Sequence, residues 1–394
     1  MPEISPYILI FILVLFATLL SRSVPKLNEP LYVICFMAMT AFLALRYGQG
    51  TDYSMYEYYY LAAPNSIDFG SLYFTDLYHT ETGWKVVMML LRTCNVPFEA
   101  FIAVLSLAMM ACLSRCIRLF SPARMLSLLI AFPTLYLTGF FSMLREGFVV
   151  AIFLGFLLQL LLEDRKPVVY ICTSLALSFI HSVALILIAV YVIARFIDHS
   201  KDRNWLWLLL GVFLLAGILP LASEGLRSFL STLPGIGYYY RDVQVSWLAF
   251  GERVLWFAVI VPMGYRIASG APKDSIIQSN LLPRLLDLYV IGFALYCLFL
   301  PSPITASRFF FPFESLELLL VPLVFSFTVK WRSVVLLLVI ALSVLFVIKN
   351  LDAYLGERGY YDFVSWVSYP YVSIFDDHEQ LSLYREPYKL SGMP

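Results

Sequence analysis

The sequence has little charge. Asp, Glu, Lys and Arg make up 14% of its residues, whereas a typical soluble domain has about 25%. Its 27 basic residues equal its 27 acidic residues in number, so no basic excess points to nucleic acid. Composition therefore argues against a soluble fold and gives no reason to expect a nucleic-acid partner.

The sequence also lacks the cysteine spacings that are typical of folds held together by disulfides or by zinc. Its six cysteines lie mostly within apolar runs, the usual setting of inert thiols. The sequence contains no internal repeat and no low-complexity tract. Its N-terminus lacks the basic start of a signal peptide, so we expect the first helix to be retained. We expect no cofactor and no metal, since the acidic run Asp376–Glu379 is typical of a solvated segment.

What the sequence does contain is apolar length. Hydrophobic residues make up 61% of the chain, and the mean hydropathy is +0.81. The apolar runs are Tyr7–Leu20, Leu31–Leu45, Phe98–Leu113, Met125–Phe140, Phe148–Leu162, Val168–Arg195, Trp205–Leu221, Val254–Ala268, Leu285–Leu300, Phe309–Val329 and Val334–Ile348. Long runs indicate spanning helices, whereas a barrel has short alternating segments. We predict an all-α polytopic integral membrane protein with about 11–12 transmembrane helices.

One run is too long for a single crossing. Val168–Arg195 has 28 residues. As one helix it would measure about 42 Å, against a hydrocarbon core of roughly 30 Å. We predict a break at the polar segment Ser178–Ser182. With two crossings there and the N-terminus outside, 15 of the 27 basic residues fall in inner loops, as the positive-inside rule requires.

This topology divides the chain into a membrane domain and a tail. We expect residues 1–349 to form one transmembrane domain with outer loops 46–97 and 222–253. Residues 350–394 form an aromatic-rich outer tail packed on the membrane domain. In the first outer loop, the amphipathic stretch Trp84–Arg92 is too short to span, so we expect it to be interfacial or re-entrant.

A polar, tyrosine-rich stretch follows the second apolar run. Within residues 46–60, Arg46 is a cation suited to phosphate and Asp52 is an acceptor. Tyr53 and Tyr56 offer flat faces with polar tips. The stretch is either the edge of a ligand site or an interfacial turn with a tyrosine belt.

Three more candidates lie at the same predicted face. Glu81 stands at a site mouth or complements a helix dipole. Arg145 and Glu146 adjoin in a very short loop, so one of them should face the bundle, unless Arg145 snorkels to headgroups. His181 lies at the predicted break as a general base, a diphosphate partner or a packed core residue.

Two later segments repeat this chemistry. The segment 234–242 joins glycines and tyrosines, among them Tyr239, to Arg241. Arg308 is expected to cap the outer end of a helix. Glu314 and Glu317 follow, three residues apart, and should share one helix face. They form part of a site or a structural ion pair with an arginine.

The order of these motifs resembles that of the EpsG/Wzy family of bacterial exopolysaccharide and O-antigen polymerases. The resemblance covers roughly residues 30 to 320. It rests on Arg46-x-Gly-x-Gly-Thr-Asp-Tyr53, Glu81-x-Gly-Trp84, Leu144-Arg145, His181-Ser182 and Ser307-Arg308-Phe309. The family commonly has Arg-Gln and His-His where this chain has Arg145-Glu146 and His181-Ser182. The resemblance therefore implies a role for Arg145 and His181 but none for Glu146 or Ser182.

The resemblance implies a polymerase at the periplasmic face of the bacterial inner membrane. It would transfer a growing glycan from undecaprenyl diphosphate to a lipid-linked repeat unit, with inversion and without metal. Its partners would be the lipid-linked donor and acceptor, membrane lipids and, as an optional addition, a chain-length regulator. By this resemblance, the diphosphate cradle would be Arg46, Arg145, Arg241 and Arg308, the base Glu81, Asp52 or His181, and the sugar-binding aromatics Tyr53, Tyr56, Trp84 and Tyr239.

Three other functions remain open at this point. A lipid-linked glycan ligase uses the same donor, and only its product differs. A flippase or transporter should expose a polar path at both faces, whereas the polar clusters here gather at one. A non-catalytic scaffold would tolerate neutral replacements of the outer arginines and acids.

Overall fold

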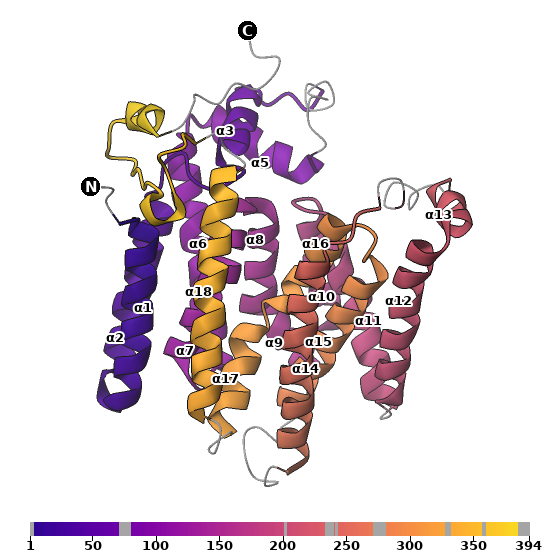
Figure 1. Cartoon of the computed structure of the whole chain (residues 1–394). Helices are drawn as coiled ribbons and strands as arrows, with labels where there is room; N and C mark the ends of the chain where they lie inside the picture. Colours follow the sequence, from indigo (N-terminus) through magenta and orange to yellow (C-terminus); the bar gives the residue numbers. More distant parts are fainter. Residues whose placement is uncertain are drawn as a thin grey trace. The chain divides into compact units, whose positions relative to one another are not determined.

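The computed structural model describes most of the chain, and its helices follow the apolar runs (Figure 1). The described residues are 4–70, 80–200, 203–232, 240, 243–270, 281–327, 332–356 and 360–384. The one β-bridge among them joins Arg46 to Ser373. The predicted all-α fold is therefore confirmed for the described part of the chain.

The helices belong to two compact units. The first unit contains residues 1–155, 179–181 and 329–394, and the second contains 156–178 and 182–328. Helices of the first unit are α1 (Pro6–Ser23), η1 (Pro25–Leu27), α2 (Asn28–Ala44), α3 (Tyr53–Ala62), α5 (Thr82–Thr93), α6 (Phe98–Phe120), α7 (Arg124–Ala131), η2 (Phe132–Ser142), α8 (Leu144–Ile152), α18 (Arg332–Gly356), η5 (Trp366–Ser368) and η6 (His378–Leu383). Segment η3 (Phe153–Leu157) crosses the boundary. The second unit holds α9 (Leu158–Leu162), α10 (Pro167–Ser178), α11 (Ala184–Ser200), α12 (Asn204–Ala222), α13 (Glu224–Ser231), α14 (Trp247–Gly270), α15 (Leu281–Leu298), α16 (Pro303–Glu314) and α17 (Glu317–Phe327).

Singly or joined end to end, many of these helices are long and apolar enough to cross a membrane. Within the described residues nine segments qualify, and the pair α16–α17, bent by 48°, makes a tenth. The apolar helices α10 and α11 are shorter. The upper figure of the predicted 11–12 is reached when α10 and α11 each count as one crossing.

The long apolar run breaks where its polar residues predict. Helix α10 ends at Ser178 and α11 begins at Ala184, which confirms the break. The intervening segment Phe179–His181, which we call the connector, packs within the first unit, although both flanking helices belong to the second. The break therefore places His181 in the first unit.

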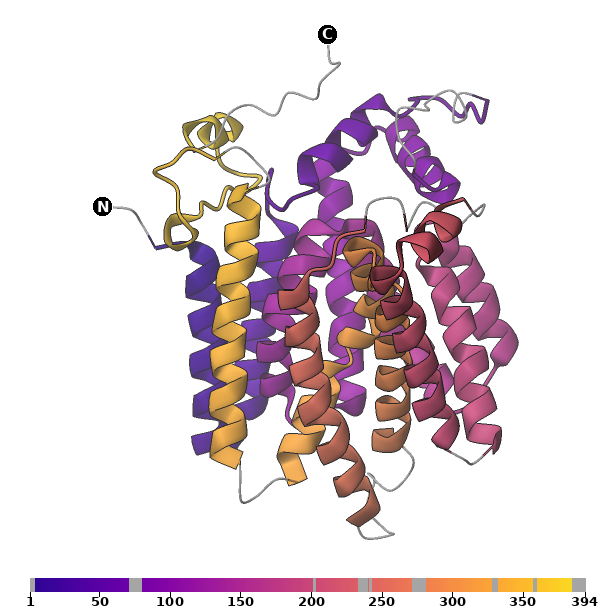
Figure 2. The ribbon, with the colours of Figure 1, turned by 45° about the vertical axis from the view of Figure 1, so that its right-hand side comes forward.

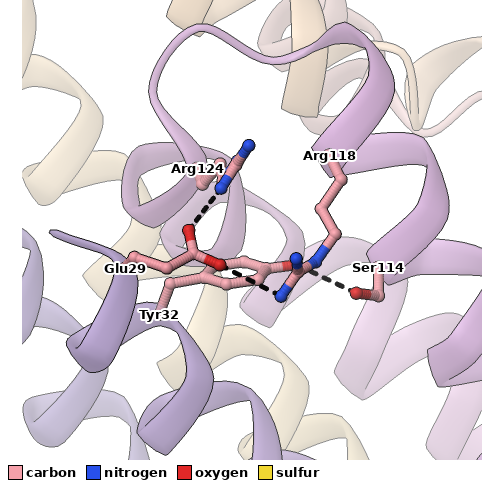
Figure 3. A network of polar contacts seen from close by, with 5 residues as sticks. All are labelled: Glu29, Tyr32, Ser114, Arg118 and Arg124. Carbon is pink, nitrogen blue, oxygen red and sulfur yellow. Dashed lines mark hydrogen bonds and ion pairs between the residues drawn. The ribbon is translucent and has the colours of Figure 1, made fainter.

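At one end, the spans of the first unit are joined by ion pairs. The carboxylate of Glu29, near the start of α2, lies 3.1 Å from Nη2 of Arg118 in α6 and also pairs with Arg124 of α7 (Figure 3). The Arg118 guanidinium lies over the ring of Tyr32, whose hydroxyl donates to Ser114. Glu29 and Arg118 are each 47% exposed, so this network adds about 1 kcal/mol or less.

The other end of α2 leads to α3 and α5, which lie beyond the first residues of α6 (Figures 1 and 2). Helix α5 is the short amphipathic element expected over residues 84–92. It buries Trp84, Met88 and Met89 along one side. These buried residues are four and five positions apart, so they lie on one face of the helix, as in any amphipathic helix.

The described part of the C-terminal tail packs on this same end, as expected. Tyr47 donates its N–H to Val372, and Ile374 donates its N–H to Leu45, at 2.9 and 2.8 Å. Tyr371 stacks on Phe42 with ring centroids 4.0 Å apart. Helix α18 continues to Gly356, so the tail leaves the membrane helix a little later than residue 350.

Candidate active site

Glu81 is the centre of the polar cluster that the first unit assembles. It is the N-cap residue of α5, yet its side chain makes no capping hydrogen bond. One carboxylate oxygen pairs with Nη1 of Arg145, and the other lies 3.8 Å from Nδ1 of His181. The carboxylate therefore serves two distant segments of the chain and does not cap its own helix.

A close backbone approach brings the connector to Glu81. A Cβ built on Gly83 would lie 2.6 Å from the carbonyl oxygen of Phe179. The N–H of Trp84 donates to that same carbonyl at 3.2 Å. The Glu-x-Gly-Trp sequence is thus explained physically. Glycine allows the contact, and the adjacent N–H fixes the segment that carries His181.

Arg145 reaches Glu81 from the short junction between η2 and α8. Its guanidinium carbon lies 5.9 Å from the ring centroid of Tyr56. Its Nε has no hydrogen-bond partner among the described residues. Glu146, the next residue, is buried. The neighbouring charges therefore occupy different surroundings, as expected for adjacent helical positions.

The cluster is enclosed but not sealed. Side-chain exposures are 20% for Glu81, 15% for Arg145 and 10% for His181. Tyr56 and Trp84 pack beside the cluster with ring centroids 5.9 Å apart. Burial raises the pKa of Tyr56, while the charge of Arg145 opposes that rise. A partly desolvated cluster of this kind strengthens electrostatic interactions with a ligand.

Two predicted residues stand at the start of α3. Asp52 is half-buried and precedes Tyr56 by one helical turn, where its carbonyl accepts the N–H of Tyr56. Tyr53 is fully buried and packs edge-on against Phe98. Burial raises the pKa of Tyr53 well above its ordinary value. The structure gives Tyr53 a packing position in place of the expected sugar-binding surface.

Arg46 likewise has a different place from the one expected for a phosphate ligand. Its side chain is 0% exposed. Nη1 donates to Leu43 at 2.7 Å, and Nη2 donates to Phe140 at 3.0 Å. These carbonyls stand at the C-terminal ends of α2 and η2, where a cation is favourable. Arg46 therefore caps two helices, and its burial removes it from the candidate site.

The second unit contains a separate polar cluster. Nε of Arg253 lies 3.4 Å from Glu314, and the guanidinium lies over the ring of Tyr296. Tyr289 donates its hydroxyl to Glu317 at 2.6 Å. Sequence reasoning assigned no role to Arg253, although an arginine beside a long apolar stretch was the available signal. Glu314 ends α16 and Glu317 begins α17, so they do not share one continuous helix as expected, although the charges of both act on Arg253.

The remaining candidates have different outcomes. Arg308 is exposed within α16, which begins at Pro303, so the expected capping role was wrong. Arg241 and Tyr239 lie outside the described residues. Asp377 caps η6, and Asp376 accepts from Ser373, so these tail acids serve local turns.

Comparison with protein families matches residues 30–365 to the EpsG family. The match spans both units, and it includes Glu81, Arg145 and His181. The chain belongs to the EpsG family. Comparisons with curated proteins and with solved structures gave no significant match. EpsG membership agrees with the helical fold and supports a membrane protein of the polysaccharide-polymerase type.

EpsG membership also extends the earlier resemblance toward the C-terminus. The match reaches residue 365, so it includes the whole of α18. That helix packs on η2, the segment that leads to Arg145. The family match therefore includes Glu81, Arg145 and His181, and also helix α18, which packs on the segment leading to Arg145.

Proposed function

We propose that this EpsG protein is a polysaccharide polymerase. It transfers a growing glycan from undecaprenyl diphosphate to a lipid-linked repeat unit at the periplasmic face of the inner membrane. The observation that carries the proposal is the carboxylate of Glu81, shared between Arg145 and His181. Base, orienting acid and cation are thus present within one partly exposed cluster.

Arg145 supplies the cation for the departing diphosphate. One edge of its guanidinium holds Glu81, while Nε keeps a donor without a partner in the described structure. Arginine binds phosphate oxygens through two parallel N–H groups. The diphosphate would take this second edge, and the positive charge would stabilise the negative charge that develops as the glycosidic bond breaks.

His181, oriented by Glu81, accepts the proton. Glu81 lies 3.8 Å from Nδ1 of His181, where its charge stabilises the imidazolium that forms. The acceptor oxygen attacks the anomeric carbon, the bond from that carbon to the diphosphate oxygen breaks, and the bonding electrons leave with the diphosphate. The hydroxyl proton moves to the imidazole of His181. A single displacement of this type inverts the anomeric configuration.

A reconstituted reaction tests the proposal. Purified protein is incubated with an undecaprenyl-diphosphate-linked repeat unit, and the products are resolved as a size ladder. We expect Arg145→Lys and His181→Gln each to slow polymerisation by about 100-fold. Arg118→Gln, which alters an ion pair at the other end of α6, is the matched control and should retain activity.

The products separate the polymerase from its rivals. A ladder of growing repeats supports polymerisation, whereas one transfer to a different acceptor identifies a ligase. Normal ladders from both Arg145→Lys and His181→Gln would refute the assigned roles. Comparison of the donor's anomeric linkage with the newly formed linkage tests inversion, and retention contradicts a single displacement.

A further inference from the structure

Segment η2, which leads to Arg145, has an unusual backbone. It is a π-helix of 11 residues. At its end the N–H of Met143 donates to the carbonyl of Thr138, five residues earlier, at 3.1 Å. Such wide helices are rare and are mostly confined to single turns at functional sites. A π-helix of this length therefore needs support from outside its own backbone.

Helix α18 provides that support. Asn350 donates its amide to the carbonyl of Pro133 at 2.8 Å and accepts the hydroxyl of Thr138 at 2.8 Å. One turn later, Tyr354 donates its hydroxyl to the carbonyl of Leu137. Side chains of α18 thus hold the wide turns of η2 at three points.

The far end of η2 is held by the loop that follows α2. Arg46 donates to the carbonyl of Phe140 at 3.0 Å. Gly50 packs so closely that a Cβ there would lie 2.2 Å from the carbonyl oxygen of Phe141. Contacts from α18 and from the loop after α2 therefore reach the carbonyls of Pro133, Leu137, Phe140 and Phe141.

This geometry fixes the direction of Arg145. Segment η2 ends at Ser142, α8 begins at Leu144, and Arg145 is its second residue. A π turn contains one residue more than an α turn. A Cβ built on Gly147 would lie 2.4 Å from the carbonyl oxygen of Gly139, so α8 packs closely on η2 after the non-helical residue Met143. If a turn of η2 relaxes to α-helical winding, the end of η2 shifts and moves this junction, and with it Arg145, away from Glu81.

We infer that Asn350 is a positioning residue for Arg145, acting through the wide turns of η2. The inference rests on the proposed function only in the consequence for polymerisation. The structural part is that the π-helical winding, and with it the Glu81–Arg145 pair, depends on the two hydrogen bonds that Asn350 makes with η2.

A cross-linking experiment tests the structural part without any activity. The full-length chain carries Glu81→Cys and Arg145→Cys, with the exposed Cys94 and Cys172 replaced by serine. A short bifunctional thiol reagent then reports the proximity of positions 81 and 145. We expect addition of Asn350→Leu to lower the cross-linked fraction at least about fivefold, because the side chains separate. An unchanged fraction would overturn the inference.

Two matched variants distinguish positioning from general damage to α18. Ser343 is buried on the same face of α18, seven residues earlier, so Ser343→Ala should leave cross-linking unchanged. Asn350→Gln keeps a donor and an acceptor and should restore most of the cross-linking. Thr138→Val removes one of the two hydrogen bonds between Asn350 and η2. It replaces Asn350→Leu in the experiment if that variant does not fold. Loss of cross-linking in Ser343→Ala as well would mean that Asn350 has no special role.

Polymerisation with the otherwise native chain tests the consequence. We expect Asn350→Leu to slow the reaction by about tenfold or more, since small misplacements of catalytic groups are costly. Asn350→Gln should recover most of that loss. If cross-linking falls while polymerisation stays normal, Arg145 is not part of the reaction and the proposed function fails. If cross-linking does not fall, the positioning role fails whatever the activity.

Discussion

At the scale of single residues, Arg46 and Arg145 show how surroundings give one side chain two roles. Arg145 pairs with a carboxylate in a partly exposed cluster. Arg46 is fully buried and meets carbonyl oxygens at the ends of two helices. Burial lowers the pKa of Arg46 from its ordinary value, but a guanidinium still keeps its proton at neutral pH. The two arginines should therefore fail in different ways when they are replaced.

Replacement of Arg46 should affect folding. Arg46→Ala leaves buried carbonyls unpaired and opens a cavity, so we expect the unfolding free energy to fall by about 3 kcal/mol. Thermal unfolding in detergent measures the effect, with Arg118→Ala as the exposed control. A variant that melts normally but no longer polymerises would instead place Arg46 in the site.

Tyr53 gives a pH-dependent prediction. Its hydroxyl is buried without a hydrogen-bond partner among the described residues, so Tyr53→Phe should change stability by no more than about 1 kcal/mol at neutral pH. Because burial raises its pKa, the stability that Tyr53 contributes is complete below its ordinary value of 10.0. That contribution is lost as the pH rises from there through the raised folded value.

Unfolding curves at several alkaline pH values test this role. The native chain should lose stability above about pH 10 more steeply than Tyr53→Phe. Polymerisation by Tyr53→Phe should remain normal, since Tyr53 packs in the core. A large loss of activity at unchanged stability would restore the sugar-binding role expected for Tyr53.

At the scale of elements, the glycine at the start of α5 decides where the connector lies. Gly83→Ala would force the connector carbonyl away, because a Cβ at Gly83 lies 2.6 Å from it. We expect polymerisation to fall by about tenfold or more, as His181 moves away from Glu81. The matched control is Gly251→Ala in α14, where a Cβ meets no atom within 4 Å. It should keep activity and gain about 0.5–1 kcal/mol in stability. Equal activity of the two variants would contradict the docking role.

The tail offers a test of its own attachment. Tyr371 stacks on Phe42 and donates its hydroxyl to the carbonyl of that residue. Tyr371→Ala should therefore loosen the tail, and limited proteolysis should cut within it several times faster. Phe375, four residues later, is 80% exposed, so Phe375→Ala should leave the cleavage rate unchanged. Equal rates would show that the backbone pairing alone holds the tail.

At the scale of the whole molecule, the sequence predicts what depends on local pattern. The long apolar runs predict the helices, and the polar segment Ser178–Ser182 predicts the break between α10 and α11. Glu81, Arg145 and His181 were among the residues predicted for the site, and Arg145 was predicted because a charge between two apolar helices is costly unless it serves a function. The sequence could not show that Glu81 is shared, since that depends on the packing of the connector.

Three other features could not be predicted from the sequence pattern, because they also depend on how distant segments pack. A buried arginine at a helix end has the same sequence signature as an interfacial one, so Arg46 was expected in the site. The 48° bend between α16 and α17 places Glu314 and Glu317 on different helices, although their spacing suggests one face. The π-helical winding of η2 depends on Asn350, more than 200 residues later.

The hydrogen bond from Ser5 to the carbonyl of Val367 joins nearly the first described residue to nearly the last, at 2.6 Å. During biosynthesis, the start of the first helix therefore has no Val367 to bond with until translation has passed that residue. Closure of contacts this distant in sequence is slow and leaves partners exposed in the meantime. Nascent chains stopped before the tail should thus be the ones that membrane quality-control proteases remove first.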